Sequence, residues 1–129
     1  MNSFIDPLRE KYKKMRPVFC PYFNQEVLFT TKGFKHLIFK DYGMRNRGEI
    51  RERFALLDIA SEILFSSGTV QEYENNGIEF FGFIAIIKEK KYKIVVLRSK
   101  DGSYKFYSVI PYWRTGKRDV FLLKNHPEG

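Results

Sequence analysis

Apolar residues recur at helical spacing between Asn46 and Ser66 and form one continuous stripe. Asn46 can cap the start of this segment with its side chain, and Glu49 stands three residues later in the capping-box position. Because the stripe ends at a Ser-Ser-Gly sequence, it predicts one amphipathic helix of about five turns. The stripe comprises Ile50, Phe54, Leu56, Leu57, Ile59, Ala60, Ile63 and Leu64.

Beyond this helix the pattern becomes typical of β-strands. Residues 69–74 and 78–87 flank an Asn-Asn-Gly turn, and residues 92–98 and 104–111 flank a loop that contains an Asp-Gly pair. Four sequential strands with short turns predict an antiparallel meander. Residues 78–87 are apolar on both faces, which predicts that they form the central strand, covered on one side by the helix.

Shorter elements are expected at the two ends of the chain. Residues 7–15 predict a short helix, followed by an extended crossing that ends at Pro21. Residues 26–31 are rich in β-forming side chains and predict a first or edge strand, and residues 120–123 predict a last one. The architecture expected from this order is α+β, with N-terminal helices packed on a four- to five-stranded antiparallel β-meander.

The chain has the length of one domain, because its 129 residues contain no repeat and no low-complexity linker. We therefore expect residues 1–129 to form a single domain. Within it, residues 1–25 are interpreted as an N-terminal basic extension, residues 26–123 as the core and residues 124–129 as a flexible tail.

The charge is strongly positive and unevenly distributed. Lys and Arg number 23 against 15 Asp and Glu, a formal charge of +8, which makes a polyanion the leading partner class. Residues 88–118 hold ten bases and two acids, whereas residues 54–87 hold five acids and no base. Each basic run taken alone is also explained as a solubilising hairpin tip. Together the runs predict one basic side and favour nucleic acid.

Several chemistries lack the residues that they require. Cys20 is the only cysteine, which excludes an internal disulfide and a thiolate-rich metal site, and it is expected to be a buried small hydrophobe. With His36 and His126 the only histidines, no metal and no other cofactor is predicted, and no phosphate-loop or dinucleotide motif is present. No apolar stretch approaches the length of about 20 residues that spans a bilayer, so a cytoplasmic setting without membrane contact is expected.

One histidine lies within a basic segment, residues 32–40. If this segment is helical, His36 and Lys40 share a face while Phe34, Leu37 and Ile38 pack inward. RNA cleavage without a metal requires a group that exchanges a proton near neutral pH, a role that an imidazole suits. The alternative is that His36 is a half-buried surface residue.

The same reaction requires cations that stabilise the extra charge on the pentacoordinate phosphorus. The RNA 2′-hydroxyl is an internal nucleophile, so the protein need not supply one. Side chains that suit the cationic role follow His36 closely in the sequence. They are Lys40, Arg45, Arg47 and Arg51.

Residues 104–114 combine aromatic, basic and hydroxyl side chains. Strict strand alternation places Ser108 on the face of Phe106, opposite to Tyr107 and Val109. The hydroxyl of Ser108 suits a hydrogen bond to a phosphate oxygen, and aromatic side chains suit stacking on bases, with core packing as the alternative. The residues predicted to bind nucleic acid are Lys35, Arg51, Lys105, Tyr107, Trp113 and Arg114.

Short motifs over residues 29–113 occur in a familiar order: Gly33-Phe34-x-His36-Leu37, an Arg-rich helix start, a Leu-rich helix, and Phe106-x-Ser108-Val109-Ile110-Pro111. This order resembles the barnase, EndoU, colicin and RelE-type (BECR) nuclease superfamily, in particular its phage-associated branch. The resemblance implies helices followed by a four-stranded antiparallel sheet, and RNA cleavage without a metal.

The resemblance also implies site residues. The early histidine of the superfamily corresponds to His36, its basic residue to Arg45 or Arg47, and its late Ser or Thr to Ser108. His126 lies in the tail, so the second acid or base would have to be Lys40, an arginine or Tyr107.

Together these observations predict a metal-independent endoribonuclease of the toxin or phage and mobile-element effector type. It would cleave RNA, such as tRNA or rRNA, by attack of the 2′-hydroxyl, and an acidic antitoxin or immunity protein would be a second partner. The predicted catalytic residues are His36, Lys40, Arg45, Arg47 and Ser108. Two alternatives stay open: a non-catalytic RNA- or DNA-binding module that uses the basic face, and a basic domain bound by an acidic protein.

Overall fold

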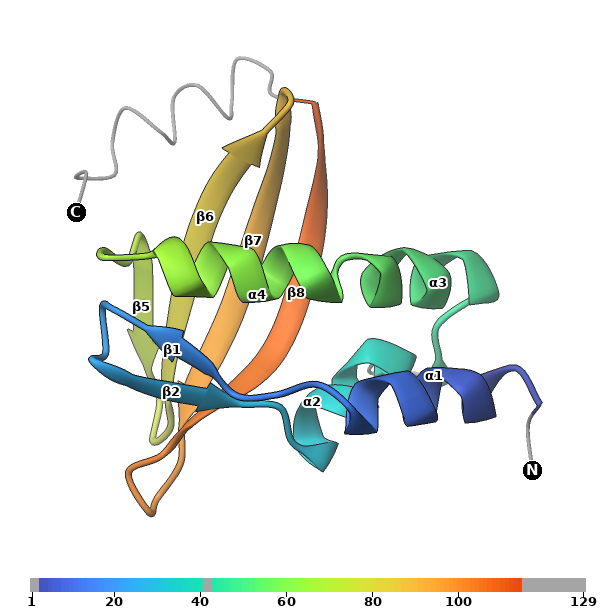
Figure 1. Cartoon of the computed structure of the whole chain (residues 1–129), viewed down its shortest axis with the longest axis horizontal. Coiled ribbons are helices and arrows are strands. Elements are labelled where there is room, and N and C mark those ends of the chain that lie inside the picture. The colour runs from blue at the N-terminus through green and yellow to red at the C-terminus, as the bar shows by residue number, and fades with distance from the viewer. Residues whose placement is uncertain (1–2, 41–42, 115–129) are drawn as a thin grey trace.

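Helices pack against one face of a six-stranded sheet in the computed structural model, which describes residues 3–40 and 43–114 (Figure 1). The helix α4 crosses in front of the strands β6, β7 and β8, and the core lies between them. The elements in chain order are α1 (Ile5–Lys13), β1 (Val18–Cys20), β2 (Gln25–Leu28), α2 (Thr31–Ile38), β3 (Phe39–Lys40), β4 (Gly43–Met44), α3 (Arg47–Ala55), α4 (Leu57–Ser66), β5 (Glu72–Asn75), β6 (Glu79–Ile87), β7 (Lys90–Arg98) and β8 (Tyr104–Arg114).

The predicted α+β architecture and meander are confirmed. Strands β5, β6, β7 and β8 pair antiparallel in sequence order. Gly77 and Gly102 occupy the connecting turns with φ angles of 104° and 86°, the left-handed region that favours glycine. The predicted last strand, residues 120–123, lies outside the described residues.

The sheet is larger than the meander, because β2 pairs in parallel with β8 and β1 extends the sheet beyond β2. The strand order is therefore β1-β2-β8-β7-β6-β5. This order corrects the prediction for residues 78–87: β6 lies next to the edge strand β5, and the central strands are β7 and β8. The apolar residues on the second face of β6 are only partly covered, and Ile86 is exposed.

The single five-turn helix predicted after Asn46 is wrong in one respect, since it divides at Leu56 into α3 and α4. The predicted cap is present: the Glu49 amide donates to Asn46 Oδ1 at 2.8 Å. At Leu56 the ψ angle of −2° departs from helical geometry. The break lets the consecutive residues Leu56 and Leu57 both reach the core, whereas adjacent residues of a straight helix face about 100° apart.

The segment before residue 26 contributes to the same core. Ile5 and Tyr12 of α1 are buried in it, as is Cys20 of β1. The expectation that Cys20 is buried is thus confirmed, and desolvation raises the pKa of its thiol. None of the helices in the described segments is long and apolar enough to cross a membrane.

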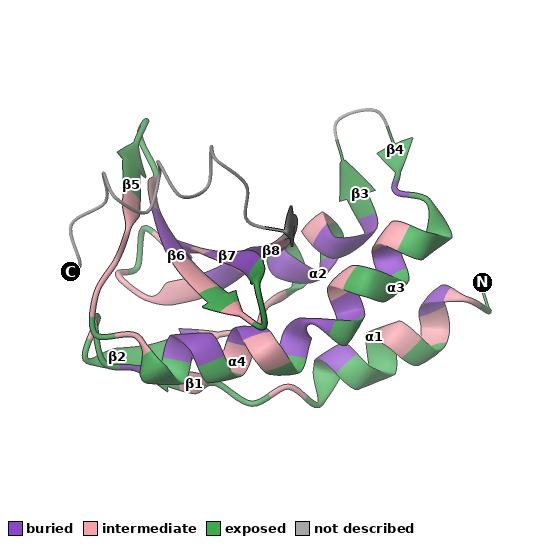
Figure 2. Cartoon of the chain, turned by 90° about the horizontal axis from the view of Figure 1, so that it is seen from above, coloured by how far each residue is buried: buried purple, intermediate pink, exposed green. Residues whose placement is uncertain are grey.

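The helix α2 lies beside β8, and the small β3–β4 hairpin, whose strand residues are exposed, projects beyond it (Figure 2). Residues 39 and 40 belong to this hairpin, so the predicted helix over the basic segment ends at Ile38. Lys40 therefore does not share a helical face with His36, which corrects that prediction. The inward set is confirmed, because Phe34, Leu37 and Ile38 are all buried.

Candidate functional site

Contact between α2 and β8 depends on a glycine. A Cβ atom at Gly33 would lie 2.6 Å from the Phe106 carbonyl oxygen and 2.6 Å from the Tyr12 hydroxyl, so only glycine allows this approach. The residues flanking Gly33 on the outer side of α2, among them Lys32, Lys35 and His36, are exposed or half-buried. The close approach therefore holds α2 against the middle of the sheet, with its basic side facing outward.

The strand β8 contains a β-bulge at Tyr107, because Phe106 and Ser108 pair with consecutive residues of β7. The bulge puts both Phe106 and Val109 into the core. Strict alternation had placed Val109 on the face of Tyr107, and that prediction is wrong because the extra residue shifts the pleat by one position.

The bulge directs Tyr107 to the side chain of His36. Their ring centroids lie 4.2 Å apart at an interplanar angle of 37°, and the ring of Phe80 meets Tyr107 edge-on at 5.3 Å. Tyr107 thus links α2 to the sheet face opposite α4. The two residues that suit proton transfer and base stacking are neighbours.

An open hollow of about 480 Å³, here named the α2 hollow, lies where α2, the β3–β4 hairpin and β8 meet. Its volume falls in the range of ligand sites, about 300–1,000 Å³. It brings together five of the predicted site residues and two others. The lining residues are Lys32, Lys35, His36, Phe39, Lys40, Arg45 and Tyr107.

Arg45 holds the hollow in shape. Its side chain is only 8% exposed, Nε donates to the His36 carbonyl at 3.2 Å, and Nη1 lies 3.5 Å from Glu49 Oε2. Its backbone amide donates to the carbonyl of Ile38 at 2.8 Å. Arg45 therefore ties the end of α2 to the start of α3, which gives it a positioning role; its predicted catalytic role stays a prediction.

Replacing Arg45 with alanine should lower the free energy of unfolding by about 2 kcal/mol, because it leaves the Glu49 carboxylate and the His36 carbonyl without this donor. Urea denaturation measures the change. Arg47→Ala is the matched control: Arg47 is exposed and lies 4.9 Å from the ring centroid of Phe4, so its loss should cost less than about 1 kcal/mol. Equal losses for the two variants would contradict the positioning role.

Lys40 shares its carboxylate partner with Arg45, since Lys40 Nζ lies 3.3 Å from Glu49 Oε1. Desolvation acts to raise the pKa of Glu49, but the hydrogen bond and charge of Lys40, with the charges of Arg45 and Arg53, hold it below its ordinary value. Two of the predicted phosphate-stabilising cations thus share one carboxylate partner, which offsets one of their two charges.

The depressed pKa of Glu49 predicts a loss of stability in acid. The unfolded chain binds this proton more readily than the folded chain does, so the contribution is complete above the unfolded pKa and is lost as the pH falls through the folded pKa. Glu49→Gln should therefore reduce the fall in urea midpoint between about pH 5 and pH 3. Glu62→Gln, an exposed substitution on α4, is the control and should keep the parent's pH dependence.

Other predicted site residues lie away from the α2 hollow. Arg51, like Arg47, packs over Phe4, with its guanidinium 5.1 Å from the ring centroid. Lys105 Nζ donates to Ser99 Oγ at 2.9 Å, at the turn between β7 and β8. The side chains of Trp113 and Arg114 lie outside the described residues.

Ser108 does not line the α2 hollow. Its side chain is 1% exposed, and its hydroxyl has no hydrogen-bond partner in the part of the chain that the structure describes. Two lining residues were missed by sequence reasoning, Lys32 and Phe39. A sequence signal for Phe39 was present, because an apolar residue directly after the inward pair Leu37 and Ile38 cannot continue the buried helical face. In the structure, Phe39 is 46% exposed.

Residues 3–40 and 43–114 contain no group of three or more His, Cys, Asp or Glu side chains that could hold a metal ion. Scans against protein-family models and searches of curated proteins and solved structures find no match to this chain.

Proposed function

We propose that this chain is a metal-independent endoribonuclease whose active site is the α2 hollow. The observation that carries the proposal is the meeting of one imidazole, His36, with several cationic side chains and Tyr107 around one open space. The lysines attract a polyanion, and the aromatic rings of Phe39 and Tyr107 suit stacking on unpaired bases.

In the proposed reaction, His36 takes the proton of the 2′-hydroxyl as that oxygen attacks phosphorus. The bond between O2′ and phosphorus forms while the bond between phosphorus and O5′ breaks, which leaves a 2′,3′-cyclic phosphate and a 5′-hydroxyl. The leaving oxygen takes a proton from Tyr107 or Lys40, both of which line the hollow. Lys32 and Lys35 stabilise the phosphorane, and neither forms an ion pair with another described residue.

The resemblance to the BECR superfamily supports the same proposal and extends it. Under it, the protein is a toxin or mobile-element effector that acts on tRNA or rRNA in the cytoplasm. An acidic antitoxin or immunity protein would then bind the lysines of the α2 hollow, because blocking them excludes RNA.

A non-catalytic nucleic-acid-binding module is the second candidate. The observation that favours it is the pairing of Lys40 and Arg45 with Glu49. Because of this pairing, fewer unpaired cations remain in the hollow to stabilise a transition state. The remaining positive charge still attracts a nucleic-acid backbone. This candidate predicts binding that weakens steeply with salt while the RNA stays intact.

Incubation of the full chain with total RNA in excess EDTA tests the proposal. We expect fragments that end in a 2′,3′-cyclic phosphate, identified by mass spectrometry. Lys13→Ala removes one exposed charge on α1, where Lys13 pairs with Glu10 at 3.5 Å, and should cleave as the parent does. Intact RNA with salt-dependent binding would favour the second candidate, and intact RNA without binding would exclude both.

A further inference from the structure

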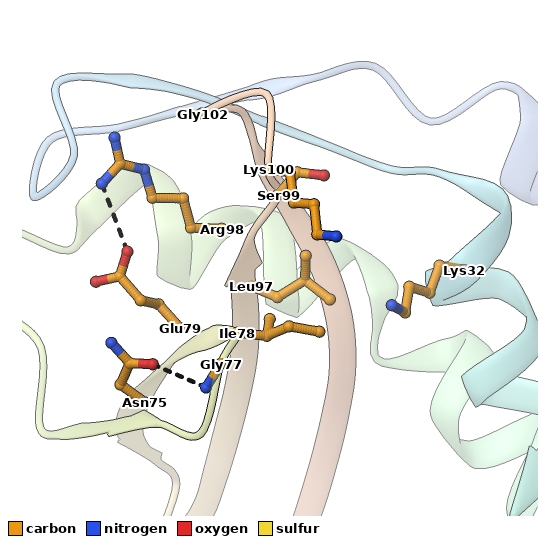
Figure 3. Close-up of a pocket in the computed structure, with 10 residues that line it drawn as sticks. All are labelled: Lys32, Asn75, Gly77, Ile78, Glu79, Leu97, Arg98, Ser99, Lys100 and Gly102. Atoms are coloured by element: carbon orange, nitrogen blue, oxygen red, sulfur yellow. Dashed lines mark hydrogen bonds and ion pairs between the residues drawn. The ribbon is translucent and has the colours of Figure 1, made fainter.

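A second hollow adjoins the first. It has a volume of about 430 Å³ and lies between the β5–β6 turn, the β7–β8 turn and the start of α2 (Figure 3). We name it the turn hollow. Its lining residues are Lys32, Asn75, Gly77, Ile78, Glu79, Leu97, Arg98, Ser99, Lys100 and Gly102.

Lys32 lines both hollows, so one side chain of α2 stands at their boundary. The sequence singled out neither Lys32 nor the turn residues as a site. The two turns stand before β6 and after β7 in the chain, and the antiparallel pairing of β6 with β7 brings them to the same end of the sheet. A strand of nucleic acid that left the α2 hollow past Lys32 would therefore meet the turn hollow next.

The charges of the turn hollow are arranged for an anion. The side chains of Lys32 and Lys100 extend toward the same space (Figure 3), and neither is ion-paired within the described segments. Its one carboxylate, Glu79, is already engaged, since it accepts a hydrogen bond from the Tyr73 hydroxyl at 2.7 Å and lies 3.5 Å from Arg98 Nη1. The unbalanced charge facing the hollow is therefore positive.

Apolar side chains form the floor beside the two lysines. Leu97 is 3% exposed and Ile78 is 37% exposed, and in Figure 3 they lie next to each other, with Lys100 above them and Lys32 to their right. An apolar floor flanked by two ammonium groups matches a nucleotide, whose flat base prefers the apolar surface and whose phosphates prefer the cations. An inorganic anion would make no use of this floor.

We propose that the turn hollow binds the nucleotide next to the one cleaved, so that one single-stranded RNA occupies both hollows with a phosphate at Lys32. This inference rests on the proposed function of the α2 hollow and deepens it, because it names single-stranded RNA, held by at least two successive nucleotides, as the substrate class. Lys100 contributes only to the second subsite, and Lys35 only to the first.

Binding of fluorescently labelled oligothymidylates, which lack the 2′-hydroxyl, tests the subsite without cleavage. We expect Lys100→Ala and Lys35→Ala each to weaken binding of a hexanucleotide about threefold to tenfold and to lower the salt slope by about 0.7. A mononucleotide, thymidine 5′-monophosphate, is too short to occupy both hollows, so at most one of the two variants should weaken its binding. Lys90→Ala, which removes an exposed charge at the opposite end of β7, is the control and should bind as the parent does.

The outcomes separate the two proposals. If Lys100→Ala binds the hexanucleotide as tightly as Lys90→Ala does, the subsite is refuted, whether or not the protein cleaves RNA. If Lys100→Ala shows the expected loss but the EDTA assay shows no cleavage, the nuclease proposal fails and the two hollows remain a binding track. Equal losses for Lys90→Ala and Lys100→Ala would refute the subsite as well, because bulk charge would then explain both.

Discussion

Replacing Gly33 with alanine is expected to destabilise the protein by about 3 kcal/mol, the upper end of the usual cost of overpacking. The added Cβ would lie 2.6 Å from the Phe106 carbonyl oxygen and 2.9 Å from Phe106 Cδ2. Neither neighbour can yield easily, because Phe106 is fully buried in the central strand β8. The third close atom, the Tyr12 hydroxyl, is held by its hydrogen bond to the Thr30 carbonyl at 2.7 Å. The helix α2 must then move away from the sheet.

Urea denaturation measures this loss, with Gly68→Ala as the matched control. Apart from Gly68 itself and its two chain neighbours, no described heavy atom lies within 4 Å of a Cβ built on Gly68, so that variant should stay within about 0.5 kcal/mol of the parent. The higher helix propensity of alanine favours the Gly33 variant by about 1 kcal/mol, and a net gain in stability would show that α2 does not touch β8 so closely. Because α2 carries His36, we also expect Gly33→Ala to weaken nucleic-acid binding.

Elements set by neighbouring residues were predictable from the sequence. The Asn46 cap, the glycines of the two hairpin turns and the inward face of α2 all depend on residues within a few positions of one another. The α2 segment shows the limit of this reasoning. Its helical pattern extends formally to Lys40, but Phe39 adopts an extended conformation with a ψ angle of 152° and pairs with Met44 instead.

Features set by distant contacts were not predictable. The parallel pairing of Val27 with Tyr104 joins strands that are separated by most of the chain, and no local pattern specifies it. The bulge at Tyr107 depends on the register of β7 against β8, which strand alternation assumes to be regular. The bulge bears directly on the candidate site, since Tyr107 at the bulge lies against the ring of His36.

The sequence therefore predicted which kinds of side chain form the site, but not the role of each residue. His36, Lys35 and Lys40 were identified because bases surround a single histidine, and all three line the α2 hollow. The role of Arg45 was not visible, because burial and a bond to a backbone carbonyl depend on the folded chain. The charge count also treated Lys40 and Glu49 as independent, whereas the fold pairs them.

Replacing His36 with glutamine is expected to lower the rate of RNA cleavage by about 10²- to 10⁴-fold, the usual contribution of a positioned acid or base. Glutamine keeps a polar side chain of similar length but cannot exchange a proton near neutral pH. The pH–rate profile of the variant should lose one limb. Binding of the labelled hexanucleotide should change less than threefold, because the lysines of the α2 hollow remain.

Two further variants separate catalysis from packing at the contact between His36 and Tyr107. Tyr107→Phe keeps the ring that meets His36 and removes only the hydroxyl, so it slows cleavage if that hydroxyl is the second acid and leaves the rate unchanged if Lys40 has this role. His36→Phe keeps an aromatic ring against Tyr107, so it should retain the parent's urea midpoint and lose activity as the glutamine variant does. Full cleavage by a folded His36→Gln or His36→Phe protein would remove His36 from the mechanism and leave the α2 hollow as a binding surface.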